Sequence, residues 1–75
     1  MPRLPRASGR TIARALEAAD FDLVRIAGDH ARLRNPRTGR QTTIPLTNHP
    51  LPVGTIASIL RQAGLSADEL RRLLD

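Results

Sequence analysis

The chain has 75 residues, which is enough for one small domain with a thin hydrophobic core. It lacks cysteine, which excludes disulfides and thiolate metal sites, and no apolar run approaches the length of a membrane span. The 12 basic residues, all arginine, outnumber 7 acidic residues and give a formal net charge of +5. The excess lies in residues 1–40, and a one-sided basic surface attracts polyanions such as nucleic acids.

The first seven residues contain two prolines and two arginines and show no periodicity, which predicts a flexible basic arm. We expect residues 8–75 to form a single domain. No apolar segment follows the N-terminal arginines, as a secretory signal would require. We therefore expect the protein in the cytoplasm and away from membranes.

A first helix is predicted from Gly9 to Ala19, with Ser8 as its N-terminal cap. Apolar residues recur inside it at i, i+3, i+4 and i+7, the spacing of one helix face. This stripe consists of Ile12, Ala15, Leu16 and Ala19.

Three strands are expected next, over residues 21–26, 30–34 and 40–46, because β-forming residues or polar–apolar alternation mark each segment. Turn residues separate them, at Gly28-Asp29 and at residues 35–39. Connections this short predict an antiparallel meander.

A second helix is predicted to open at Val53 and to stop at Gly64, and a capping box at residues 66–69 begins a short last helix. The predicted fold class is α+β, with the order α-β-β-β-α, a three-stranded antiparallel sheet and a short C-terminal helix. Both main helices should cover one sheet face, which gives two layers.

Side-chain alternation assigns the strand residues to the two sheet faces. Ala31 and Leu33 should point to the helices, and we expect Val24, Ile26 and Ile44 to join them. The opposite face should then display His30, Arg32, Arg34, Arg25, Gln41 and Thr43.

A histidine among arginines suits RNA cleavage, because RNA carries its own nucleophile in the 2′-hydroxyl. Histidine can serve as acid or base near neutral pH, and arginine holds phosphate and stabilises developing charge. The alternative reading is that His30 is a solvated strand residue within an ordinary charged face, and the pattern alone favours that reading.

His49, in a proline-flanked loop, is a second candidate, which we interpret as a loop histidine without catalytic duty. Two histidines without cysteine provide no recognisable zinc site. No glycine-rich phosphate loop is present, and we expect neither a metal nor a cofactor.

At this point the chain resembles the HicA toxins. Gly28-Asp29-His30 is similar to the Gly-Ser-His that carries their catalytic histidine, and Thr43-Ile44-Pro45 looks like their strand ending in Val-Pro. Residues 54–66 are similar, nearly residue for residue, to their Gly-Thr-Leu-x-x-Ile-Leu-Lys-Gln-Ala-Gly segment. The resemblance also includes the opening helix and covers about residues 8–70.

The resemblance implies a fold like that of double-stranded-RNA-binding domains and an endoribonuclease that cleaves mRNA without a metal. It also implies neutralisation by a HicB-like antitoxin that covers the histidine face. Only His30 carries over as catalytic. The residues expected to bind RNA are Arg25, Arg32, Arg34, Arg37 and Arg40.

Two departures from the family pattern concern the site. Asp29 replaces the usual serine; a carboxylate there favours charged His30 but repels phosphate. His49 does not align with the family's later histidine, so both Asp29 and His49 are kept as accessory candidates. Two alternatives stay open: a module of the same fold that binds RNA without cutting it, and an interaction protein whose basic face docks an acidic partner.

Overall fold

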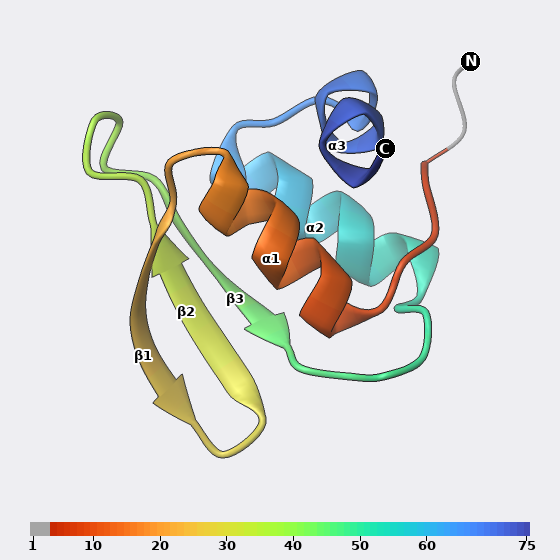
Figure 1. Ribbon diagram of the computed structural model, residues 1–75, viewed down its shortest axis with the longest axis horizontal. Coiled ribbons are helices and arrows are strands. Elements are labelled where there is room, and N and C mark those ends of the chain that lie inside the picture. Colours follow the sequence, from red (N-terminus) through yellow and green to blue (C-terminus); the bar gives the residue numbers. More distant parts are fainter. Residues whose placement is uncertain (1–3) are drawn as a thin grey trace.

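The computed structural model describes residues 4–75 of the chain. Three antiparallel strands in the order β1-β2-β3 follow one helix and precede two others, as Figure 1 shows. The elements are α1 (Gly9–Ala18), β1 (Asp22–Ala27), β2 (His30–Arg34), β3 (Gln41–Pro45), α2 (Val53–Ala63) and α3 (Ala67–Leu74). The predicted α+β class and the antiparallel meander are therefore confirmed.

Helix α1 has a defined start and end. The Ser8 side chain accepts a hydrogen bond from the Thr11 amide at 3.2 Å, which satisfies one of the free N–H groups of the first turn. At the other end Asp20 adopts φ 74°, and the Phe21 amide donates to the Leu16 carbonyl at 3.0 Å. This left-handed C-terminal cap turns the chain sharply into β1.

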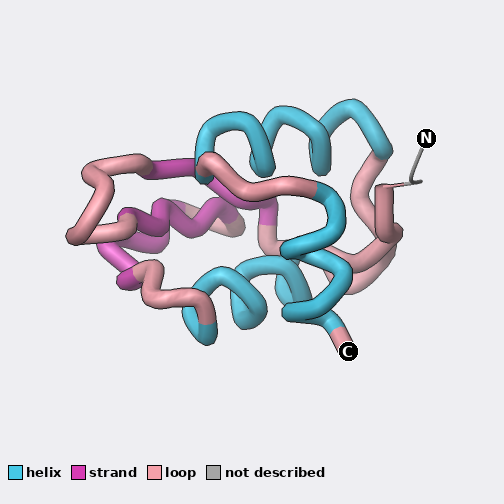
Figure 2. The backbone as a smooth tube through the Cα atoms, turned by 90° about the horizontal axis from the view of Figure 1, so that it is seen from above, coloured by secondary structure: helices cyan, strands magenta, loops and turns pink. Residues whose placement is uncertain are grey.

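The molecule has two layers, with the strands on one side and the helices on the other (Figure 2). Helix α2 packs against β3, and α1 lies across β2 and β3, so the core forms beneath the second and third strands. The fully buried large side chains of this core are Ile12, Leu16, Leu33, Ile44, Ile56, Ile59 and Leu70.

Helix α3 closes the end of the domain by packing on α1. Its start is the predicted capping box, in which the Ser66 side chain accepts from the Glu69 amide while the Glu69 carboxylate accepts from the Ser66 amide. Leu70 is fully buried, so α3 contributes to the core.

Strand β1 contains a bulge that the sequence analysis did not foresee. Leu23 lies opposite Leu33 and Arg25 lies opposite Arg32, so that Val24 is an extra residue between two paired positions. The expectation that Val24 packs under the helices is therefore wrong, and its side chain is 56% exposed.

Ile26 also departs from its predicted environment. It lies opposite buried Ala31, so it is on the helix side of the sheet, yet its side chain is 55% exposed. The reason is that β1 is an edge strand and extends past the cover that α1 provides to β2 and β3. Ile44, in contrast, is completely buried as predicted.

The predicted basic arm falls partly on residues 1–3, which lie outside the described residues. Within the described part, Leu4 and Ala7 are partly buried against the core. The Leu51 amide donates to the Ala7 carbonyl at 2.9 Å, and Ser8 forms a β-bridge with Pro50. Residues 4–7 are thus attached to the loop that precedes α2.

Candidate active site

The turn between β1 and β2 places His30 at the start of the central strand. Ala27 pairs with His30, which leaves Gly28 and Asp29 as a two-residue turn. Gly28 has φ 61°, a conformation that glycine adopts without strain and that tight hairpins of this length require. On its other side His30 pairs with Pro45, so ladders on both sides hold its backbone.

The side chain of His30 faces away from the helices and is 54% exposed. Its Nδ1 atom lies 3.2 Å from the Asp29 carboxylate Oδ1, and that carboxylate is 85% exposed. When Nδ1 carries a proton it donates to Asp29, which leaves Nε2 of neutral His30 as a proton acceptor. The Asp29 carbonyl accepts from the Leu46 amide at 2.6 Å, so β3 holds the turn in place.

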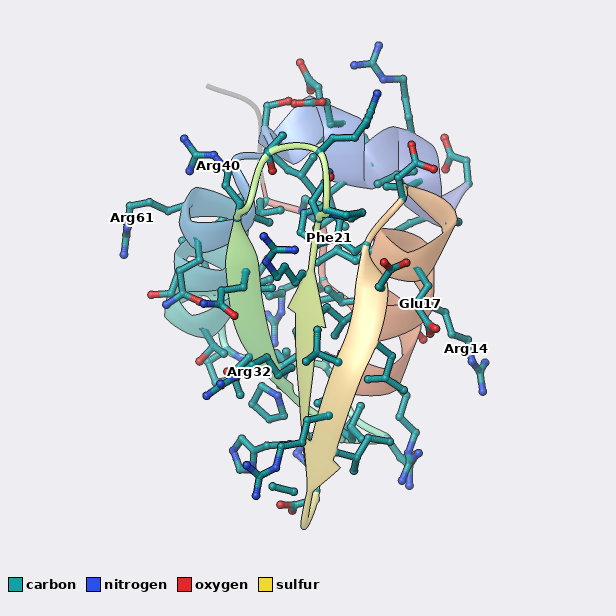
Figure 3. The ribbon with its side chains drawn as sticks, turned by 90° about the vertical axis from the view of Figure 1, so that its left-hand side faces the viewer. Arg14, Glu17, Phe21, Arg32, Arg40 and Arg61 are labelled. Carbon is teal, nitrogen blue, oxygen red and sulfur yellow. The ribbon has the colours of Figure 1, made fainter. Side chains whose placement is uncertain are left out.

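A shallow, open depression of about 230 Å³ lies beside His30 on the outer sheet face. Arg25 and Arg32, neighbours across the ladder, border it together with Ala27 and Thr43. Figure 3 shows this sheet face towards the viewer, with Arg32 extending over it. Two guanidinium groups beside an imidazole in an open hollow suit a phosphodiester, since arginine matches the geometry of phosphate oxygens.

A second depression adjoins the first and shares Arg32 and Thr43 with it. Gln41 lines it from β3 and Gln62 lines it from α2. The Thr42 hydroxyl donates to the Gln62 side-chain oxygen at 2.7 Å, and this bond holds Gln62 at the margin of the sheet. Sequence reasoning missed Gln62, because only tertiary packing brings α2 to this margin.

The structure distributes the five arginines expected to bind RNA over different surfaces. Arg25 and Arg32 lie at the His30 depression, and Arg34 follows on the same outward side of β2. Arg37 pairs with Asp20 at 3.5 Å, near the end of α1.

Arg40 lies over the C-terminal end of α2, as its distance from Gly64 shows. A β-carbon added to Gly64 would lie 2.6 Å from Arg40 Cδ, so this side chain rests against the glycine. Arg37 and Arg40 are therefore not among the residues that surround His30.

His49 lies in the exposed loop between β3 and α2. Its carbonyl accepts from the Thr47 hydroxyl at 2.8 Å, which shapes the loop. It is not among the residues that line the His30 depression. No group of three or more His, Cys, Asp or Glu side chains within residues 4–75 is placed to hold a metal ion.

Comparison with known proteins decides the family. The family model described as the HicA toxin of bacterial toxin–antitoxin systems matches residues 9–65, about three quarters of the chain. The chain belongs to the HicA toxin family. A search of curated proteins returned no match.

This HicA toxin is thus the toxin component of a toxin–antitoxin system, which implies an antitoxin as its protein partner. The matched region contains both depressions and every arginine near them, whereas α3 lies beyond it. In the described part of the chain, no helix is long and apolar enough to cross a membrane.

Proposed function

We propose that this HicA toxin is an endoribonuclease that cleaves mRNA by histidine acid/base catalysis without a metal ion. The observation that carries the proposal is His30 in an open depression bordered by Arg25 and Arg32. The membership of the HicA family supports the assignment, as does the position of His30 in the Gly-x-His tripeptide.

In the proposed reaction, Nε2 of His30 takes the proton of the RNA 2′-hydroxyl. The 2′ oxygen forms a bond to phosphorus, the bond from phosphorus to the 5′ oxygen breaks, and the products are a 2′,3′-cyclic phosphate and a 5′-hydroxyl. Because the depression is open, water supplies the proton that the leaving 5′ oxygen needs. Arg25 and Arg32 stabilise the extra negative charge on the phosphorane, a contribution that is often the largest in such reactions.

We further propose that the partner is a HicB-like antitoxin that neutralises the toxin in the cytoplasm by covering the histidine face. A basic sheet face complements an acidic protein surface as well as it complements RNA. The interaction-protein alternative is therefore part of the same proposal.

The catalytic assignment is tested by expressing the wild type, His30→Ala and His49→Ala in bacteria and following growth and mRNA integrity. Loss of a general base costs roughly 10²–10⁴-fold in rate, so His30→Ala should abolish growth arrest and mRNA decay. His49→Ala should behave as the wild type, because His49 does not line the depression. Equal growth arrest by the wild type and His30→Ala would refute the assignment.

A second candidate function is RNA binding without cleavage. The observation that favours it is the Asp29 carboxylate beside His30, since an anion at this point repels the phosphate that must approach. Two strands discriminate between the candidates: an ordinary RNA and the same RNA with 2′-O-methyl groups. Cleavage of the first and simple binding of the second support the ribonuclease, whereas binding of both without cleavage supports the RNA-binding module.

A further inference from the structure

The two edges of the sheet differ in how they are protected. Strand β3 exposes polar side chains, buries its one large apolar residue, Ile44, and ends in a proline, which has no N–H to offer. Helix α2 also packs on it. This edge is unsuited to pairing with another strand.

Strand β1 has the opposite character, since all six of its residues are exposed. Among the described residues, three of the four exposed large apolar side chains belong to it, namely Leu23, Val24 and Ile26. The bulge places them on both sides of the strand: Leu23 and Ile26 share the helix side with Leu33 and Ala31, whereas Val24 is the extra residue. An uncovered apolar edge strand is a site for strand addition unless a partner occupies it.

A groove between α1 and β1 runs beside this edge. Its volume is about 160 Å³, and its floor is apolar, with Leu23, Ile26 and Leu33 from the sheet and Ala13 from α1.

Arg10, Arg14 and Glu17 of α1 also line the groove. In Figure 3, Arg14 and Glu17 project from α1 on the β1 side of the sheet. Within the described residues, neither arginine forms an ion pair with a carboxylate of this chain. The groove therefore combines an apolar floor with two cations that have no anionic partner in the domain.

These features define the chemistry of an occupant. A strand added to β1 would satisfy the free backbone groups of the edge and would cover apolar side chains on both of its faces, which a helix lying in the groove would not do. Its inward side chains should be apolar, and acidic residues beside them would meet Arg10 and Arg14. A second copy of this chain fits poorly, because each copy has a formal net charge of +5. RNA fits poorly as well, because its phosphates would face the apolar floor.

We propose that the β1 edge and the α1–β1 groove form the docking site for an extended segment of the antitoxin, with apolar side chains at alternate positions and acidic residues beside them. The inference rests on the proposed antitoxin partnership and is independent of catalysis by His30. Since β1 leads directly into the Gly28-Asp29 turn, a segment bound there ends next to His30. Docking at the edge and occlusion of the histidine face would then be one event.

The first test measures the affinity of purified variants for the protein encoded by the reading frame that adjoins the toxin gene. Each toxin variant is made in a His30→Ala background, so that it can be produced without harm to the host. Ile26→Asp should weaken binding by about 30-fold or more, the loss typical of a central interface residue. Val53→Asp is the matched control, since Val53 is 47% exposed on α2 outside the groove, and it should change the affinity by less than about threefold.

A charge pair extends this test. Arg14→Glu should slow association by about fivefold or more at low salt, because it places an anion at the groove where the partner is acidic. Arg61→Glu, an equal charge change on exposed α2, should have little effect. Equal losses from Ile26→Asp and Val53→Asp, or from both charge reversals, would refute the site.

Hydrogen–deuterium exchange of the complex tests strand addition itself. Amides of residues 22–27 should exchange more slowly when the partner is bound, and the toxin alone should remain monomeric. Unchanged exchange in β1, or dimerisation of the toxin through this strand, overturns the proposal. Because no arm measures RNA cleavage, a failure here leaves the ribonuclease assignment standing, and a silent His30→Ala variant leaves the docking site standing.

Discussion

Asp29 has two opposite effects on the proposed reaction at His30. Its carboxylate Oδ1 lies 3.2 Å from Nδ1, so it orients the imidazole and leaves Nε2 as the base, but its charge repels the substrate phosphate. An exposed charge pair contributes up to about 1 kcal/mol, which corresponds to a factor of about five in rate. Asp29→Ala should therefore lower kcat by about that factor while it lowers KM.

Asp29→Asn separates the two effects, because its side-chain oxygen still accepts from Nδ1 while the charge is gone. It should keep most of kcat and share the lower KM. Steady-state cleavage of a short RNA measures both constants. An unchanged kcat in Asp29→Ala would mean that Asp29 only repels substrate and does not position His30.

Gly9 is required for the close contact between α1 and the end of β3. An added β-carbon would overlap the Pro45 carbonyl oxygen and would lie 3.0 Å from the Thr47 amide nitrogen. Both neighbours are backbone atoms, so neither can move aside as a flexible side chain could. Because Pro45 pairs with His30, a displacement there also moves the candidate site.

Gly9→Ala should thus destabilise the domain by about 3 kcal/mol, at the upper end of overpacking effects, and lower Tm by more than about 10 °C. Gly54→Ala provides the control within α2, because nothing lies within 4 Å of its added β-carbon. It should be neutral or stabilise the helix by up to about 1 kcal/mol. Thermal unfolding followed by circular dichroism compares the two, and similar melting temperatures would contradict the close contact.

At the scale of the elements, simple alternation predicted β2 and β3 correctly. His30, Arg32 and Arg34 are exposed while Ala31 and Leu33 are buried, because the central strand is regular and one face is covered. The same rule failed at Val24, since a bulge shifts the pairing and leaves no local signature in the sequence.

The positions of Arg37 and Arg40 were beyond alternation for another reason. Both lie between β2 and β3, where side chains have no period of two. Their directions depend on tertiary neighbours, Asp20 at the end of α1 for one and Gly64 at the end of α2 for the other. The sequence therefore predicted the fold and the histidine face, but not the extent of the arginine cluster around His30.

Helix α3 belongs to the folded unit although it lies beyond the matched family region. Its Leu70 is fully exposed to the core and shielded from solvent, whereas Leu73 is only partly buried. Leu70→Ala should destabilise the domain by about 2–5 kcal/mol, the range for buried leucines, and Leu73→Ala should cost clearly less. Urea unfolding gives both values, and equal losses would show that α3 does not anchor the core through Leu70.

At the scale of the whole molecule, the proposals divide the surface between two ligands. RNA is assigned to the outer sheet face with Arg25, Arg32 and Arg34, and the antitoxin is assigned to the edge strand β1. The two surfaces meet at the β1–β2 turn beside His30. Competition between RNA and the antitoxin is therefore expected from their positions, without a conformational change in the toxin.

The salt dependence of RNA binding measures how many arginines the RNA track contains. For a single strand, the slope of log affinity against log salt is about −0.7 per neutralised phosphate, so three arginines on the sheet face predict a slope of about −2. A 2′-O-methyl RNA prevents cleavage during the measurement. Arg25→Ala and Arg32→Ala should each reduce the magnitude of the slope by about 0.7, because both border the depression.

Arg37→Ala is the matched control for this titration, since the Arg37 side chain pairs with Asp20 near the end of α1. It removes the same formal charge from the molecule, so a purely global effect of net charge would change the slope as much as Arg32→Ala does. A local phosphate track leaves the slope of Arg37→Ala at the wild-type value. If Arg37→Ala instead reduces the slope while Arg25→Ala does not, the RNA follows the 35–40 turn, and the sheet face beside His30 is not the binding surface.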